Sequence, residues 1–281
     1  MTEPISTSTT SDSMVSAGKA GMTGLAEMPV ATTPLPTQDE LPYDDGEPME
    51  TDPHLLQIYL LRETLTRHWA DRYDFFAGGN LFFYFSPAQL KSEHFRGPDF
   101  FVALGVDDKR KRKSWVAWEE GKVPDVIIEL LSETTADFDK GEKKLIYQNQ
   151  ARVPEYFWYD LESGELAGFV LREGEYQPIE PDERGRLVSG ALGLALARWE
   201  GEYRRATTTW LRWETIDGKL LPTDSEAAER AEARARRERQ RARQEHERAE
   251  QERQRAEQER QRAELFLARL RELGVDPDSL K

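Results

Sequence analysis

The sequence predicts a mixed α/β domain with a central sheet flanked by helices, followed by a long charged C-terminal helix. Short runs of β-branched and aromatic residues are typical of strands, and segments with helical periodicity precede and separate them. Near residue 225 the composition changes to Glu, Arg and Gln with regularly spaced Ala. We therefore divide the 281 residues into a disordered tail at 1–40, a domain at 41–222 and a helix at 223–281.

Composition excludes several classes of protein. The absence of cysteine excludes disulfides and thiolate zinc sites. Neither a signal peptide nor a run of about 18 apolar residues is present, so we expect a cytoplasmic protein without a membrane partner. The formal net charge of -14 argues against a generally basic surface for nucleic acid, although it leaves room for a local basic face.

The first half of the domain begins with a helix and continues with strands. Asp52 and Pro53 have the form of an N-cap and first helical residue, and apolar residues follow at helical spacing. Aromatic residues around Gly78-Gly79-Asn80 predict a hairpin or a bulge. Further strands are expected at 99–105, 114–118 and 125–131.

A second helix and a hairpin complete the predicted domain. Asp139 and Glu142 have the spacing of a capping box, which predicts a helix from Asp139 to about Gln150. Strands are expected at 155–160 and 165–171, joined by a turn at 162–164.

The C-terminal segment carries an alanine every seventh residue from Ala228 to Ala263. A strong coiled coil needs two apolar positions per heptad, so this pattern predicts a solvated helix with at most weak coiled-coil character. Phe266, Leu270 and Leu273 form an apolar stripe at its end. The stripe leaves open self-association, including a homodimer, or docking onto the chain's own domain.

A basic run, Lys109-Arg110-Lys111-Arg112-Lys113, lies between two predicted strands. It is either the solvated tip of a hairpin or a contact for phosphate.

Two carboxylates interrupt apolar strands. Asp99 begins one strand, and Glu129 lies within the run Val126 to Leu131, where an ionised group without a partner would be costly. If the two strands are neighbours, Asp99 and Glu129 can share one divalent cation, and Lys143 can reach the same point. The alternatives are that Asp99 only starts a strand, that Glu129 pairs with a buried Arg or Lys, and that Lys143 is a surface residue.

The same residues resemble a known family. Gly97-Pro98-Asp99, the run from Trp118 to Ser132, Asp139 to Lys143, Tyr147 and Val153 to Tyr156 are together similar to the Uma-type family of restriction endonucleases, which is grouped with the PD-(D/E)XK nuclease-like superfamily. The resemblance covers residues 40 to 220. It departs from the superfamily at Leu131, where the E-x-K pattern has lysine, and Lys143 resembles the migrated lysine of this family.

The resemblance implies a restriction-endonuclease-like core and Mg²⁺-dependent cleavage of DNA, with Mn²⁺ as a substitute. Asp99 and Glu129 match the metal-binding carboxylates, Lys143 the catalytic lysine, and Glu50 an accessory acid, while the Leu130 carbonyl is a further candidate ligand. The rival hypothesis is a nuclease-like DNA-binding or assembly module without turnover, presented on the charged helix.

Overall fold

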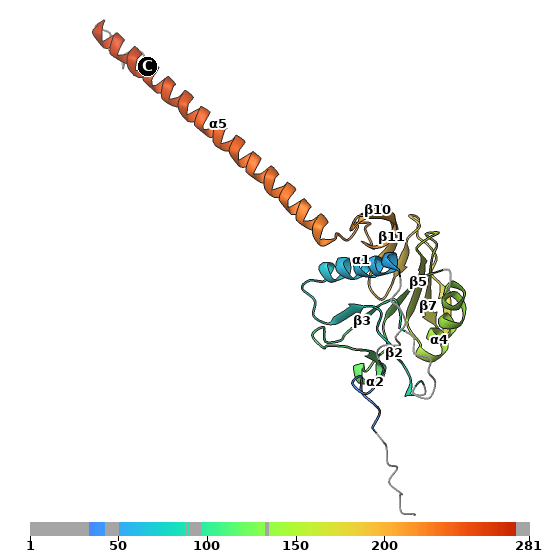
Figure 1. Cartoon of the computed structure of the whole chain (residues 1–281). Coiled ribbons are helices and arrows are strands. Elements are labelled where there is room, and N and C mark those ends of the chain that lie inside the picture. The colour runs from blue at the N-terminus through green and yellow to red at the C-terminus, as the bar shows by residue number, and fades with distance from the viewer. Residues whose placement is uncertain (1–33, 43–50, 88, 90–96, 133–134, 274–281) are drawn as a thin grey trace, which may run out of the picture. The chain divides into compact units, whose positions relative to one another are not determined.

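The computed structural model describes residues 34–42, 51–87, 89, 97–132 and 135–273. They form the predicted mixed α/β domain and a long C-terminal helix (Figure 1). The helices are α1 (Asp52–His68), α2 (Ala117–Glu120), α3 (Ala136–Phe138), α4 (Lys144–Ile146) and α5 (Asp224–Glu272), with π-helical turns η2 (Asp139–Lys143) and η3 (Tyr147–Ala151). The strands are β1 (Phe75–Gly78), β2 (Phe83–Tyr84), β3 (Phe100–Leu104), β4 (Trp115–Val116), β5 (Val126–Leu131), β6 (Glu155–Asp160), β7 (Leu166–Arg172), β8 (Glu175–Pro178), β9 (Leu187–Ser189), β10 (Leu194–Tyr203) and β11 (Ala206–Thr215). None of these described helices has the length and apolar character needed to cross a membrane.

The central sheet has the strand order β1-β3-β5-β6-β7-β8. β5 and β6 run parallel, whereas the other neighbouring strands are antiparallel. A parallel pair needs a crossover connection, and the continuous segment from α3 to η3 supplies it. This crossover brings Lys143 back toward the sheet.

The hairpin predicted around Gly78-Gly79-Asn80 is wrong. β1 pairs with β3 in the central sheet, whereas β2 pairs in parallel with β4 in a separate two-stranded sheet. Gly79 instead allows two backbone segments to approach each other, because a Cβ atom at this position would lie 1.8 Å from the carbonyl oxygen of Asp99.

Two predicted helix starts are also corrected. The N-cap of α1 is Thr51, and Asp52 is the first helical residue. The predicted capping box at Asp139 and Glu142 is wrong, because the helical segment already begins at Ala136. Asp139 therefore lies inside the segment, where its carboxylate is buried and pairs with Lys143 instead of capping backbone N–H groups.

The basic run at 109–113 is partly structural. The side chain of Arg112 is only 1% exposed, pairs with Glu120 at 2.9 Å and lies over the ring of Phe76. Arg110 pairs with Glu119 at 3.1 Å. These two arginines thus stabilise the packing of the loop, which neither of the two sequence interpretations anticipated.

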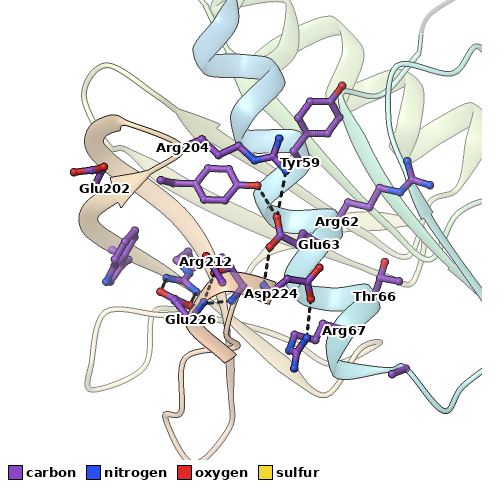
Figure 2. A pocket seen from close by; sticks show the side chains of 15 residues that line it. Tyr59, Arg62, Glu63, Thr66, Arg67, Glu202, Arg204, Arg212, Asp224 and Glu226 are labelled. Atoms are coloured by element: carbon purple, nitrogen blue, oxygen red, sulfur yellow. Dashed lines mark hydrogen bonds and ion pairs between the residues drawn. The ribbon is translucent and has the colours of Figure 1, made fainter. Parts of the chain in front are cut away.

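The start of α5 is anchored to the domain along an open groove of about 1190 Å³ (Figure 2). Thr223 and Glu226 form a capping box, and the Glu226 carboxylate also accepts hydrogen bonds of 2.9 and 2.7 Å from buried Arg212. Arg67 of α1 pairs with Asp224 at 2.7 Å. Beyond this anchor no described residue of α5 is buried, and Phe266 at its end is 65% exposed.

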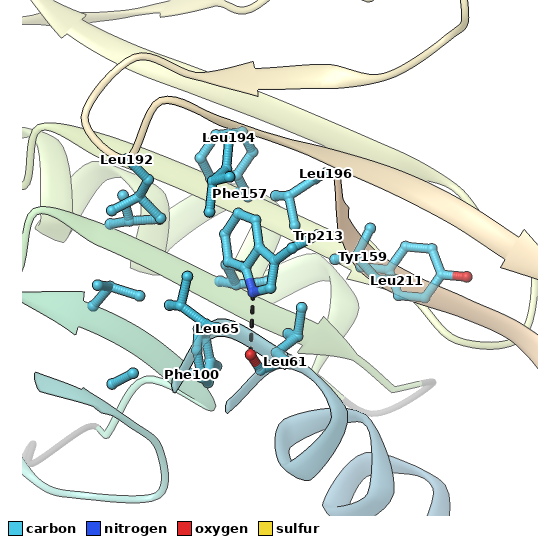
Figure 3. Packing of buried hydrophobic residues seen from close by; sticks show 14 of the residues in the cluster. Leu61, Leu65, Phe100, Phe157, Tyr159, Leu192, Leu194, Leu196, Leu211 and Trp213 are labelled. Carbon is cyan, nitrogen blue, oxygen red and sulfur yellow. Dashed lines mark hydrogen bonds between the residues drawn. The ribbon is translucent and has the colours of Figure 1, made fainter. Parts of the chain in front are cut away.

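The core lies on both faces of the central sheet. Val126, Ile128 and Leu130 of β5 pack against α1, β10 and β11, where the indole of Trp213 donates a hydrogen bond to the Leu61 carbonyl (Figure 3). Ile127 and Leu131 of β5 pack on the opposite face. Because strand side chains alternate, Glu129 belongs to this second face, which the crossover covers.

Candidate functional site

The structure brings Asp99, Glu129 and Lys143 together. The Lys143 Nζ lies 2.8 Å from Glu129 Oε2, and the backbone N–H of Asp99 donates to the same oxygen at 3.2 Å. The three residues are 7%, 0% and 8% exposed. A carboxylate pair and an ammonium group thus meet in one buried cluster at the edge of the β3–β5 pairing.

The cluster forms where the pairing of β3 with β5 stops. The last paired residues are Phe100 and Ile128, and the preceding Pro98 has no N–H with which to continue the ladder. Side chains instead satisfy the backbone N–H and carbonyl of Leu130, two residues farther along β5: the N–H donates to Asp99 Oδ2 at 2.7 Å, and the carbonyl oxygen lies 3.2 Å from His54 Nε2. Because the backbone pairing ends here, the Leu130 N–H is available to hold the Asp99 carboxylate in place.

Asp139, which the sequence pattern assigned to a helix cap, is also a member of this cluster. Its Oδ1 lies 3.1 Å from Lys143 Nζ, so the ammonium group lies between two carboxylates. The spacing of four residues between Asp139 and Lys143 was the signal for this pair. The segment between them is a π-helical turn, a rare conformation that is frequent at functional sites.

Tyr147 completes the contacts of Glu129. Its hydroxyl donates to Glu129 Oε1 at 3.0 Å, and the residue is 1% exposed. Tyr147 is part of the family pattern in the sequence, but that pattern assigned it no role. Both carboxylate oxygens of Glu129 are therefore held by the chain.

Burial and charge shift the pKa values in the cluster. Burial, together with the nearby carboxylates Asp99 and Asp139, raises the pKa of Glu129 well above its usual value. Burial opposes the charged form of Lys143, but the surrounding carboxylates, Glu129 foremost, outweigh it and raise the pKa of this ammonium group. Burial also raises the pKa of Tyr147, which keeps the phenol protonated as a donor. The cluster thus places one ammonium group among the carboxyl groups of Asp99, Glu129 and Asp139.

The remaining predicted residues occupy different places. Leu131, at the position of the usual E-x-K lysine, is 3% exposed and packs in the core. Asp125 immediately precedes β5, and its carboxylate accepts hydrogen bonds from the Leu104 N–H and from Lys122. Glu50 lies outside the described residues.

The donor set fits a hard divalent cation. Asp99, Glu129 and the Leu130 carbonyl offer oxygen ligands, which Mg²⁺ prefers, and Mg²⁺ commonly binds through one or two carboxylates while keeping several waters. Within the described ranges, no three His, Cys, Asp or Glu side chains form a metal site by themselves. A cation at this point would therefore depend on the backbone carbonyl, water or substrate as well as on side chains.

The described residues thus combine a mixed α/β fold with a buried carboxylate–lysine cluster. The chain belongs to the Uma2 family, described as "Putative restriction endonuclease", which matches residues 27–200. No curated protein matches the chain. Among solved structures, a "putative nuclease belonging to DUF820" from Anabaena variabilis is similar with 16% identity and a TM-score of 0.39, over 56% of this chain and 90% of that one.

Proposed function

We propose that the chain is a Mg²⁺-dependent endonuclease that hydrolyses DNA phosphodiester bonds. The observation that carries the proposal is the contact of Lys143 with Glu129 beside Asp99, because it joins candidate metal ligands to an ammonium group. Membership of a family described as restriction endonucleases supports nuclease chemistry and DNA as its substrate.

Asp99, Glu129 and the Leu130 carbonyl would hold the cation, and Mn²⁺ would substitute for Mg²⁺. When bound, such a cation makes water more acidic and stabilises charge on the reacting phosphate. The Asp99 N–H and the Tyr147 hydroxyl orient the Glu129 carboxylate from two sides. Its orientation is therefore fixed before substrate arrives.

Lys143 offsets negative charge that develops on the phosphate in the transition state. It can leave Glu129 without losing its place, because Asp139 lies 3.1 Å from the same ammonium nitrogen. The second carboxylate therefore keeps the lysine charged and close to the reacting group.

The test is the nicking of supercoiled plasmid by the purified full chain with Mg²⁺ or Mn²⁺. Asp99→Ala and Glu129→Gln should abolish nicking, and Lys143→Met should reduce it about 10²–10³-fold, the usual effect of removing one charge-stabilising donor. Lys140→Met is the matched control, since Lys140 lies on the same helical segment and pairs with Glu165 instead. Equal nicking by wild type and Asp99→Ala would refute the proposal, because it would indicate a contaminating nuclease.

The second candidate function is a DNA-binding or assembly module without turnover. The described length of α5, 49 residues with none buried, favours it because such a helix is available to partners. Retention of DNA that is indifferent to Mg²⁺ and to Asp99→Ala, without nicking, would support this candidate over the enzyme. Sedimentation of the full chain would show whether it acts as a homodimer, which would supply one site for each DNA strand.

A further inference from the structure

The hydroxyl of Thr51 does not perform the usual task of its position. A threonine at the N-cap normally accepts a hydrogen bond from a backbone N–H in the first helical turn. Thr51 is the N-cap of α1, yet its side chain makes no such bond. Its Oγ1 lies instead 2.8 Å from Nδ1 of His54. The threonine thus orients a side chain rather than capping the helix.

The partner of His54 fixes the state of its ring. Nε2 lies 3.2 Å from the Leu130 carbonyl oxygen, which can only accept, so Nε2 carries a proton. Its Nδ1 lies 2.8 Å from the Thr51 hydroxyl, so both ring nitrogens have a partner and the orientation of the ring is fixed.

The two peptide groups that flank the Cα atom of Leu130 are thereby each held by a side chain. Its N–H donates to Asp99, and its carbonyl accepts from His54. Thr51, His54 and Leu131 also line a cavity of about 490 Å³. Replacing the imidazole by a methyl group would therefore open the carbonyl to water and leave its direction unset.

We propose that His54, oriented by Thr51, is a positioning residue that directs the Leu130 carbonyl toward a divalent cation held with Asp99 and Glu129. This inference rests on the proposed function. A carbonyl oxygen has two lone pairs, so the imidazole and the cation can share it. Partners that orient metal ligands in this way typically change metal affinity 10–100-fold when they are removed.

The test is isothermal titration of Mn²⁺ into the full-length chain, without DNA. His54→Ala should weaken Mn²⁺ binding about 10–100-fold. His54→Gln should restore part of the affinity, because its amide can donate to the carbonyl, and Thr51→Val should weaken binding in the same direction. His68→Ala is the matched control, since His68 lies on the same helix in an exposed position. Thermal unfolding of each variant verifies that it is folded.

The outcomes separate this inference from the proposed function. If wild type binds Mn²⁺, Asp99→Ala abolishes binding and a folded His54→Ala variant keeps wild-type affinity, the role of His54 is refuted while the metal site stands. If the wild-type chain binds no Mn²⁺, the role of His54 and the proposed metal-dependent function are both refuted. Equal weakening by His54→Ala and His54→Gln would also overturn the inference, because it assigns the effect to packing rather than to a hydrogen bond.

Discussion

Lys143 reaches Glu129 from the helical crossover and not from the strand that carries the glutamate, with 2.8 Å between Nζ and Oε2. The β5 position where the related pattern has lysine is occupied by Leu131, which packs in the core. The crossover thus provides the positive charge while β5 keeps an apolar side chain. Since Asp139 and Lys143 lie in one π-helical turn, the same segment supplies both the ammonium group and one of its two carboxylate partners.

Gly79→Ala should disrupt the site through the backbone. The added Cβ would lie 1.8 Å from the Asp99 carbonyl oxygen, so one of the two segments must move. We expect a loss of about 3 kcal/mol in the free energy of unfolding and loss of nicking. Gly141→Ala is the control, because a Cβ there meets nothing within 4 Å, and it should be neutral or stabilising by about 0.5–1 kcal/mol. Urea unfolding and plasmid nicking of both variants measure these effects.

Tyr147→Phe should lower both stability and activity. It removes the donor to Glu129 Oε1 and leaves a buried acceptor without that partner, which costs about 1–3 kcal/mol. Tyr159→Phe is a matched control, since the Tyr159 hydroxyl donates to the Thr209 carbonyl away from the cluster. Both variants should lose stability in urea unfolding, but only Tyr147→Phe should lose nicking. Equal activity of the two would contradict the role given to Tyr147.

Truncation should reveal where the domain ends. The small amount of apolar surface before the tip of this helix predicts that residues 226–281 are dispensable, but Glu226 is the carboxylate partner of Arg212, a fully buried residue. A chain ending at Ala233 should therefore unfold at nearly the wild-type temperature. A chain ending at Ser225 should lose about 3 kcal/mol, because a buried charge loses its partner. Differential scanning calorimetry of both truncated chains distinguishes the two boundaries.

The same pair should make part of the stability sensitive to acid. Hydrogen bonds from Arg212 hold the pKa of Glu226 below its usual value of 4.5. A carboxyl group that is more acidic when folded stabilises the fold above its unfolded pKa, and this contribution is lost as the pH falls through the folded pKa. The difference in unfolding free energy between wild type and Glu226→Gln should therefore be largest near neutral pH and shrink in acid. A difference that grows in acid would contradict this assignment.

The sequence predicted the parts of the fold that depend on local pattern. The apolar run of β5 and the β6–β7 hairpin follow from residue type and turn chemistry, and the structure has both. The Gly78-Gly79 segment was misread because Gly79 allows a close backbone approach to Asp99, which is distant in sequence. Local pattern does not reveal such an approach.

The residues of the candidate site likewise fall into those that the sequence revealed and those that it did not. Asp99 and Glu129 were visible because a carboxylate is conspicuous in an apolar strand. Asp139 was hidden because its spacing to Glu142 also fits a capping box, and only the earlier helix start at Ala136 removes that interpretation. His54 was hidden because its partner is a backbone carbonyl 76 residues away.

The pairing of β3 with β5 stops at Phe100 and Ile128, and this leaves the backbone of Leu130 to side chains of other elements. Pro98 contributes to this opening through its backbone alone, because it has no N–H to offer the Leu130 carbonyl and its own carbonyl accepts from the Asn80 N–H. Any other residue at position 98 would bring an N–H that could compete with His54 for that carbonyl, even while every acidic and basic group of the cluster remained in the sequence.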